Sequence, residues 1–423
     1  MPFADSSPLL VSALNKGVGH TAAPLSPDAT ARVGWSLLDE EISLPAAVLY
    51  EARLAHNLAW MRAFMDEYGV KLAPHGKTTM APKLFARQIE SGAWGITLAN
   101  AHQARVAHRH GIGRVLVANQ LVGGENFRIV SELLRDPAFE LYCLVDSAQN
   151  VEQLGRYYRD AGQTLDVLLE LGPMGGRTGV RNTEQERDVL DALALWSGSL
   201  RLAGVEVYEG VLTEEADIRA FLQRAVDAVK RIAAEGRFGR TPPILTGAGS
   251  AWYDVVAEEF SPAKIGIDAE VVLRPGCYLT HDVGVYRKAQ EQIQRRNPVA
   301  ARMGAGLLPA LQLWAYVQSI PERERAIVAL GKRDAAFDAG LPTPALHFRP
   351  GSPSAPEHAP AHWELTGMMD QHAYLRIAEG DDIRVGDMIG FDISHPCLTF
   401  DKWRHILVLD AQFRAMDVVQ TYF

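Results

Sequence analysis

The sequence predicts an α/β protein built from a (β/α)8 TIM-like barrel and a second, smaller all-β domain at its C-terminal end. Its 423 residues exceed a typical single domain and suit two. Between residues 45 and 285, β-like and helix-like runs alternate in about eight units, the number that a barrel needs. Over residues 286–423 the segments become short, β-like and interrupted by glycine and proline. A doubly wound sheet is the main alternative for the first part.

Residues 1–44 precede this alternation and are rich in serine and proline. We expect them to form an irregular arm that packs on the β domain. Regular structure begins near Pro45, and the first helix is predicted over 53–68, where Leu54 and Leu58 share one face at helical spacing.

The remaining elements follow the same two periodicities. The predicted barrel strands are 70–73, 95–98, 114–118, 140–145, 166–171, 204–208, 243–246 and 270–274. The predicted helices between them include 83–91, 101–110, 151–161, 184–196 and 214–235. The predicted strands of the β domain are 311–319, 325–330, 345–348, 387–393 and 403–409, with a loop rich in proline and serine over 349–360.

Composition excludes several classes of function. Acidic residues outnumber basic ones by 51 to 42, so the protein lacks the basic surplus that nucleic-acid binding needs. Its three cysteines cannot form a disulfide framework, which favours a reducing compartment. Neither a membrane-spanning apolar run nor a secretory signal is recognisable. We therefore expect a cytoplasmic enzyme or binding protein that takes a small molecule.

The first candidate site is the segment LAPHGKTTM, in which Lys77 follows a predicted strand. Barrel active sites lie at the C-terminal ends of strands. We expect Lys77 to be buried enough to lose its charge, and a neutral amine can condense with an aldehyde to form a Schiff base. A solvated lysine that caps a loop is the alternative.

A second candidate is the glycine-rich segment ILTGAGSAWYD after the predicted strand 243–246. Gly247, Gly249 and Ser250 precede an expected helix start near Ala251. Backbone amides at such a position bind phosphate, and barrels often hold a phosphate after strands seven and eight. An ordinary turn remains possible at this position.

The segment HPC is the third candidate. In an extended segment, His395 and Cys397 would point to the same face and reach one metal ion together. Imidazole and thiolate suit zinc, and two protein ligands leave positions open for substrate. The alternative is a core cysteine beside a surface histidine.

Two further strand ends carry polar side chains. Arg177, in LGPMGGRTGV, could clamp a carboxylate or phenolate, or could be a surface arginine. In GVEVYEG, Glu206 or Tyr208 could face the barrel mouth, where a tyrosine could hydrogen-bond a pyridine nitrogen. The alternative for that tyrosine is an aromatic side chain that fills the barrel.

Together, these segments resemble one enzyme family. PHGKT, RTGV, YEG, TGAGS, LRPGCYLTHD and HPC occur in the order typical of the D-serine dehydratase-like and D-threonine aldolase-like branch of the alanine racemase-like, fold-type III enzymes. The resemblance runs from Pro45 to the C-terminus. The chain departs from that pattern at Thr79-Met80 and at Gln371-His372.

The resemblance implies a barrel that holds pyridoxal 5'-phosphate (PLP) on Lys77, a C-terminal β domain, a homodimer and a divalent metal. It implies a metal bound by His395 and Cys397, where the aldolase branch has an aspartate as its second ligand, so Cys397 favours elimination. The predicted PLP-binding residues are Lys77, His75, Arg177, Tyr208, Thr246, Gly247, Gly249 and Ser250.

The function predicted on this basis is a lyase that converts a D-3-hydroxy amino acid, such as D-serine, to a 2-oxo acid and ammonia. Zinc is the expected metal, with manganese and cobalt open. A D-threonine aldolase is the first alternative. An amino-acid racemase and a PLP-binding protein without turnover come next, and a sugar- or phosphate-metabolising barrel without PLP is the least specific possibility.

Overall fold

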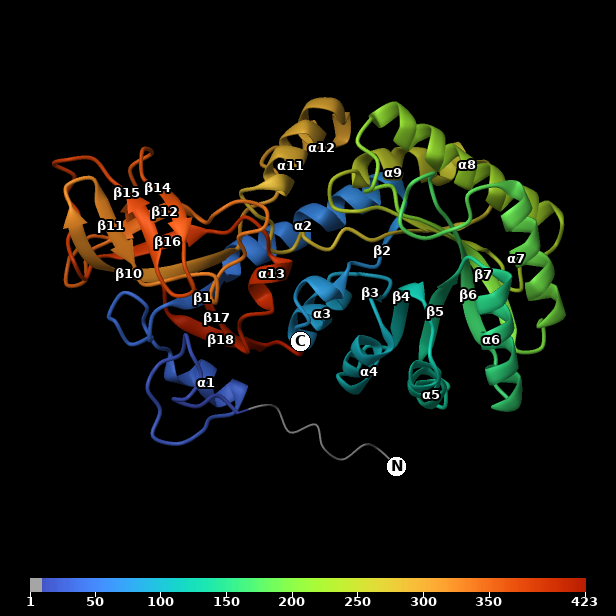
Figure 1. The fold of residues 1–423 in the computed structure, drawn as a ribbon, viewed down its shortest axis with the longest axis horizontal. Helices are drawn as coiled ribbons and strands as arrows, with labels where there is room; N and C mark the ends of the chain where they lie inside the picture. The colour runs from blue at the N-terminus through green and yellow to red at the C-terminus, as the bar shows by residue number, and fades with distance from the viewer. Residues whose placement is uncertain (1–9) are drawn as a thin grey trace.

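The computed structural model describes residues 10–423, and it separates into an α/β barrel and a β-rich part (Figure 1). Two sheets form the framework, one of eight strands and one of ten. Helix α2 (Glu51–Tyr68) runs from the second sheet towards the barrel. Within residues 10–423, no helix combines the length and the apolar character needed to cross a membrane.

The eight-stranded sheet is parallel throughout and has the order β2-β9-β8-β7-β6-β5-β4-β3. Its strands are β2 (Lys71–Leu72), β3 (Ile96–Leu98), β4 (Arg114–Gln120), β5 (Glu140–Val145), β6 (Leu165–Leu171), β7 (Leu200–Val207), β8 (Ile244–Gly247) and β9 (Glu270–Leu273). A parallel bridge between His75 and Thr97 joins the two ends of this order. The predicted barrel is therefore confirmed over the doubly wound alternative.

Helices cover the outside of this barrel. They are α3 (Pro82–Glu90), α4 (Ala101–Arg109), α5 (Gly124–Leu133), α6 (Ala148–Asp160), α7 (Thr183–Leu195), α8 (Glu215–Ala234), α9 (Tyr253–Phe260) and α10 (Pro262–Ile265), whereas the short turn η1 (Gly76–Thr78) follows β2. Polar caps fix several of their starts: Ser147 accepts a hydrogen bond from the backbone N–H of Asn150, and Asn182 accepts one from Gln185. Because both faces of a parallel sheet are covered, strands such as β5 are almost continuously buried.

The ten-stranded sheet is mainly antiparallel. Its strands are β1 (Ala46–Tyr50), β10 (Leu311–Glu322), β11 (Arg325–Val328), β12 (Thr343–Phe348), β13 (Glu357–His358), β14 (Glu364–Met368), β15 (Ala373–Arg376), β16 (Met388–Asp392), β17 (His405–Leu409) and β18 (Ala415–Gln420). Strand β1 lies between β10 and β17, antiparallel to the first and parallel to the second. Residues 46–50, which the sequence assigned to the barrel, thus belong to the other sheet.

Residues 286–302 also differ from the all-β prediction. They lie in α11 (Val285–Arg296) and α12 (Pro298–Arg302), which pack against the barrel. Arg296 pairs with Asp254 on α9, and Asn297 donates a hydrogen bond to Tyr68 on α2. The predicted boundary at residue 286 therefore precedes the change from helices to strands, because β10 begins only at Leu311.

The described part of the N-terminal arm packs against the ten-stranded sheet. It contains helix α1 (Pro27–Val33), and Val11, Trp35 and Leu37 share an apolar cluster with strands of that sheet. Lys16 binds Asp334 and lies over the ring of Trp403. The predicted arm thus covers one face of the sheet, and residues 1–9 lie outside the described range.

Candidate active site

Lys77 lies on a short turn at the C-terminal end of β2. Gly76 allows this turn to sit close to the core, because a Cβ there would approach Ile96 to 2.7 Å and Phe85 to 2.8 Å. The prediction that Lys77 is buried is wrong for this chain, since its side chain is exposed at the open mouth of the barrel. The turn therefore presents the amine where a ligand can reach it.

His75 precedes the lysine turn and is held as a neutral imidazole. Burial, reinforced by the positive charges of Arg274, Lys77 and Arg177, lowers the pKa of His75 well below its usual value. Its Nδ1 atom is buried without a hydrogen-bond partner. This ring thus offers a group that a bound molecule could satisfy.

The glycine-rich segment after β8 binds an oxyanion in this structure, but the oxyanion is a side chain. The carboxylate of Glu209 accepts hydrogen bonds from the backbone N–H groups of Ala248, at 3.1 Å, and Gly249, at 2.6 Å. Burial raises the pKa of Glu209. The predicted helix start near Ala251 is wrong, because α9 begins at Tyr253. A phosphate would share these amides or displace Glu209 from them.

Ser250 connects this segment with the chain that follows β9. Its Oγ accepts hydrogen bonds from the backbone N–H groups of Gly276 and Cys277, both at 3.1 Å. Thr246 is fully buried with an unpartnered hydroxyl, and Gly247 ends β8 against Val207. The predicted residues after β8 therefore gather with a backbone segment that the sequence did not associate with them.

Arg177 and Tyr208 approach each other from neighbouring strand ends. The guanidinium lies 5.4 Å from the centre of the tyrosine ring. Burial raises the pKa of Tyr208, so its hydroxyl stays protonated and can donate a hydrogen bond. Arg177 is exposed and, like Lys77, lies at the open mouth.

A buried ion pair lies deeper in the barrel. Arg274 contacts the carboxylate of Glu206, and both side chains are almost inaccessible to solvent. Burial raises the pKa of Glu206 to about 7, against the pull of Arg274. The Nε and Nη1 atoms of Arg274 and the Oε2 atom of Glu206 have no partner. Sequence reasoning did not single out Arg274, although the strand end that carries it was a usable signal.

His395 and Cys397 adjoin the lysine turn, but not by the predicted backbone geometry. Pro396 is helical, with φ −61° and ψ −46°, and Cys397 opens the short helix α13 (Cys397–Phe400). The extended segment is therefore a wrong prediction, because a fixed proline φ suits a first helical turn. Cys397 Sγ nevertheless lies 3.5 Å from Thr78 Oγ1, although the two residues are 319 positions apart. In Figure 1, α13 lies between the second sheet and α3.

The surroundings of this pair favour a thiolate. A hydrogen bond from Cys277, together with one from His395, lowers the pKa of Cys397 well below its usual value. His395 Nδ1 lies 2.8 Å from Asp338 Oδ2, which leaves Nε2 available to a metal. Imidazole plus thiolate, with a carboxylate behind the imidazole, fits a zinc-type ion. Sequence reasoning missed Asp338 and Cys277, which are close only in the fold.

The metal fits this pair of side chains on one condition. Among residues 10–423, no three His, Cys, Asp or Glu side chains are arranged to hold an ion together as they stand. A metal bound here thus needs a further ligand or a side-chain rotation. For PLP, the unpartnered buried atoms of His75, Thr246 and Arg274, near the C-terminal ends of the barrel strands, supply polar groups that a cofactor would satisfy.

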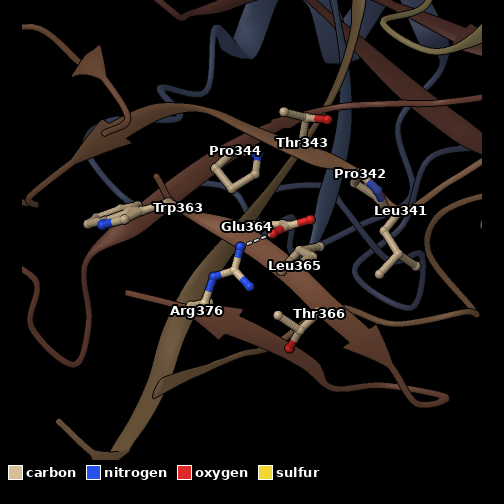
Figure 2. A pocket seen from close by; sticks show the side chains of 9 residues that line it. All are labelled: Leu341, Pro342, Thr343, Pro344, Trp363, Glu364, Leu365, Thr366 and Arg376. Carbon is tan, nitrogen blue, oxygen red and sulfur yellow. Dashed lines mark hydrogen bonds and ion pairs between the residues drawn. The ribbon is translucent and has the colours of Figure 1, made fainter. Parts of the chain in front are cut away.

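A cavity also lies within the ten-stranded sheet, away from Lys77 (Figure 2). Its volume is about 510 Å³, and an ion pair between Glu364 and Arg376 crosses it. It is lined by Leu341, Pro342, Thr343, Pro344, Trp363, Glu364, Leu365, Thr366 and Arg376. Because none of these is a lysine, histidine or cysteine, the chemistry expected of this chain belongs to the barrel mouth.

Comparison with known families divides the chain as its fold does. Residues 50–275 match the family model of the alanine racemase N-terminal domain. Residues 310–409 match the model of a putative serine dehydratase domain. The first match covers the barrel and its lysine turn, and the second covers most of the ten-stranded sheet with His395 and Cys397.

Individual relatives span most of the chain. The D-threonine aldolase of Arthrobacter sp. is 24% identical over 87% of this chain and 89% of its own length. The D-threo-3-hydroxyaspartate dehydratase of Delftia sp. HT23 is 28% identical over 57% of this chain and 62% of its own length. The crystal structure of a D-threonine aldolase from Filomicrobium marinum, 24% identical, superposes with a TM-score of 0.74, covering 92% of this chain and 97% of that one.

Structures of two variants of the Delftia dehydratase also superpose well. One replaces a histidine by alanine, with a TM-score of 0.72 and 22% identity, and covers 92% of this chain and 97% of its own. The other replaces a cysteine two positions later and is described as a metal-free form. It has a TM-score of 0.71 and 21% identity, and covers 92% of this chain and 99% of its own.

Proposed function

Because the chain belongs to the family defined by the alanine racemase N-terminal domain, we propose that it is a metal-assisted dehydratase that converts a D-3-hydroxy amino acid such as D-serine to a 2-oxo acid and ammonia. At a coarser level, the protein is a PLP-dependent lyase that acts on D-amino acids. Beyond this coarser level, we propose that the bond broken is the one to the β-hydroxyl and that the metal assists its loss.

One observation carries the proposal: Cys397, beside His395, lies 3.5 Å from Thr78, the neighbour of Lys77. The lysine turn and the metal-ligand candidates therefore face the same space. Loss of a β-hydroxyl needs a Lewis acid because hydroxide is a poor leaving group. The spacing of this histidine and cysteine equals that of the two residues altered in the Delftia dehydratase variants, one of which is metal-free.

The cofactor would be held on Lys77, with its phosphate near Gly249 and Ser250. When bound, PLP supplies an electron sink for the charge left on the substrate as the α proton departs. Tyr208 is placed to donate a hydrogen bond at the mouth, and Arg177 lies over its ring. His75, kept neutral, offers a hydrogen-bonding nitrogen without adding charge. His75, Thr246 and Gly247 remain predicted cofactor residues on this basis.

Lys77 has a second role in the proposal. Its Nζ atom accepts the α proton, because the turn presents the amine at the mouth, where the substrate arrives. His395 and Cys397 would hold zinc, or another divalent ion, which would supply a Lewis acid for the hydroxyl that leaves. Thr78, which contacts Cys397, holds the lysine turn beside the metal-ligand pair.

Product analysis tests the proposal. The purified protein, supplied with PLP and zinc, is incubated with D-serine and with D-threonine. We expect pyruvate and 2-oxobutanoate, each with an equivalent of ammonia, and loss of turnover after verified removal of the metal by a chelator. Full activity in metal-free protein would remove the metal from the proposal.

An aldolase is the second candidate, because the Arthrobacter aldolase matches over 87% of the chain. It would release glycine and acetaldehyde from D-threonine instead of 2-oxobutanoate. The same assay also distinguishes a racemase, which would form L-serine from D-serine. A binding protein would form no product from any D-amino acid.

The predicted assembly and location belong to the same proposal. A homodimer would close the open mouth over Lys77 and Arg177, both exposed in the single chain. We propose this dimer and a cytoplasmic location from the family resemblance. Light scattering measures the mass in solution, and a monomer that is fully active would contradict the dimer.

A further inference from the structure

Two cysteines from distant parts of the chain meet beside the lysine turn. Cys277 Sγ lies 3.9 Å from Cys397 Sγ. Cys277 follows β9 at the C-terminal end of the barrel, whereas Cys397 begins α13, which follows β16 of the second sheet. Their meeting point therefore lies between the two halves of the molecule, next to Thr78.

Cys277 is fixed in place by its backbone. Its N–H donates to Ser250 Oγ at 3.1 Å, and its carbonyl accepts a hydrogen bond from the backbone N–H of His281 at 2.7 Å. The residue is only 3% exposed. His281 has a positive φ of 47°, a strained value for a histidine, so the segment is held rather than free to relax. The backbone of Cys277 is thus held by two hydrogen bonds, and its thiol is buried.

The sulfur separation matches a shared metal ion. Two thiolates bound to one tetrahedral zinc, each at about 2.3 Å, are roughly 3.8 Å apart. A disulfide would need about 2.05 Å. We propose that Cys277 is a third protein ligand of the metal held by His395 and Cys397, which leaves one position for the substrate hydroxyl. This inference rests on the metal site of the proposed function and deepens it.

The surrounding charges are consistent with a cation at this point. Asp282 is 1% exposed, and its Oδ2 atom has no hydrogen-bond partner among the described residues. Its Oδ1 atom accepts backbone hydrogen bonds from Gly284 and Tyr286, so only Oδ2 is left for a positive charge to compensate. Asp338 fixes Nδ1 of His395, so the imidazole offers Nε2.

Binding of the ion requires one adjustment. As the described side chains stand, no three of them already hold a common point. The imidazole of His395, which is 25% exposed, is the group that has to turn: Asp338 holds it at Nδ1, and a bound ion would replace its present hydrogen bond to Cys397. Cys277 and Cys397 already have the separation that the bound state needs.

A second thiolate also decides which metal binds. Soft sulfur ligands favour zinc over manganese or magnesium, which prefer oxygen. Three protein ligands with one open position are the usual arrangement of a catalytic zinc. Among the metals that the sequence left open, the inferred ligand set therefore selects zinc or its cobalt substitute over manganese.

X-ray absorption at the zinc edge tests the proposal on the unaltered holoenzyme. We expect two sulfur neighbours per zinc at about 2.3 Å. A single sulfur neighbour would overturn the proposal, and so would a Cys277–Cys397 disulfide that persists in the zinc-loaded protein by mass spectrometry. This measurement needs no variant and does not depend on folding of a mutant.

Variants assign the second sulfur. Cys277→Ser should leave one sulfur neighbour and weaken zinc binding by at least ~10-fold, the lower end of the loss caused by removing even an outer-shell partner. Cys143→Ser is the matched control, because that cysteine is buried on β5, and it should keep two. Cofactor absorbance and circular dichroism check that each variant is folded. Two sulfur neighbours remaining in Cys277→Ser would contradict the assignment.

The outcome separates this inference from the proposed function. If zinc has one sulfur neighbour and D-serine is still dehydrated only in the presence of zinc, Cys277 is excluded and the proposed function stands. If zinc has two sulfur neighbours and D-serine is not a substrate, the ligand set stands and the choice of reaction is wrong.

Discussion

A buried carboxylate beside the ten-stranded sheet has a full set of partners, whereas several buried polar atoms near the ends of the barrel strands have none. In the sheet, Asp387 is 2% exposed and is hydrogen-bonded to Arg349, His347 and the backbone N–H of Arg384. Among the described residues, seven unpartnered buried atoms lie at or just beyond the ends of barrel strands: His75 Nδ1, Glu206 Oε2, Thr246 Oγ1, Arg274 Nε and Nη1, Thr280 Oγ1 and Asp282 Oδ2. Others lie on helices, at Trp60 Nε1, Asn150 Oδ1 and Gln290 Nε2.

This difference distinguishes buried polar groups that stabilise the fold from those that serve to bind a ligand. A completed network such as that of Asp387 contributes to stability, because each desolvated group has recovered a partner. An incomplete one costs stability in the free protein and is retained where a ligand completes it. The predictions below test whether the barrel groups serve a ligand and the sheet groups serve the fold.

Lys77→Ala should have the largest effect. Loss of both the cofactor attachment and the base is expected to lower turnover by at least ~10³-fold, because general base catalysis alone contributes about 10²–10⁴-fold. The visible absorbance of the cofactor should disappear, while the zinc content stays unchanged. A variant that retains the absorbance would place the attachment on another residue.

Cys397→Ser should lower dehydration of D-serine by about 10²-fold or more, because a Lewis acid on the leaving group contributes several kcal/mol. Zinc analysis should show loss of the metal, and the absorbance spectrum should show that PLP remains bound. If the variant kept the metal and lost the cofactor, Cys397 would serve PLP binding rather than metal binding.

Removal of PLP should destabilise the barrel selectively. At a free cofactor concentration of 100 times its dissociation constant, binding adds about 2.7 kcal/mol to the free energy of unfolding. Hydrogen exchange should become faster in residues 206–210, 246–250 and 274–282 of the apoprotein. Equal changes over 343–348 and 388–392 would show that the second sheet also depends on the ligand.

Asp387→Asn should lower the free energy of unfolding by about 2 kcal/mol at pH 7. This is less than the loss expected for a fully buried ion pair, because Arg349 is partly exposed. Although burial acts to raise it, hydrogen bonds from Arg349 and His347 hold the pKa of Asp387 below its usual value. The stabilisation is therefore present above the pKa of the unfolded state and is lost as the pH falls through the folded value. Urea titrations should show that the free energies of unfolding of the variant and the wild type differ less at pH 3.5 than at pH 7.

The sequence predicted the barrel well because its signals are local. Strand 140–145 is found at the predicted residues, and the predicted run 166–171 lies within β6. Helix α5, which begins at Gly124 directly after Gly123, is not among the helices that the sequence analysis names. Helices α11 and α12 were also missed, because no strand follows them at the spacing of a β/α unit.

The candidate site was predictable only in part. The order of the motifs identified Lys77 and the pair His395 and Cys397, but their proximity arises from packing between the two halves. Cys277 lies within the motif LRPGCYLTHD, but neither it nor Asp338 shows its contact locally, because each reaches its partner across more than fifty residues. The exposure of Lys77 was mispredicted for the same reason: burial at a barrel mouth depends on what covers it.

While the chain is being synthesised, β1 leaves the ribosome long before the strands that flank it. Val48 pairs with Gln312 on β10 and with Leu407 on β17. At roughly 5–20 residues per second, the interval before Leu407 emerges is on the order of 20–70 s. All five residues of β1 are buried in the finished molecule, so a nascent apolar strand stays uncovered for that time. A chain truncated before β17 would leave β1 as an open edge that can pair with other chains, so translational arrest late in the message favours aggregation.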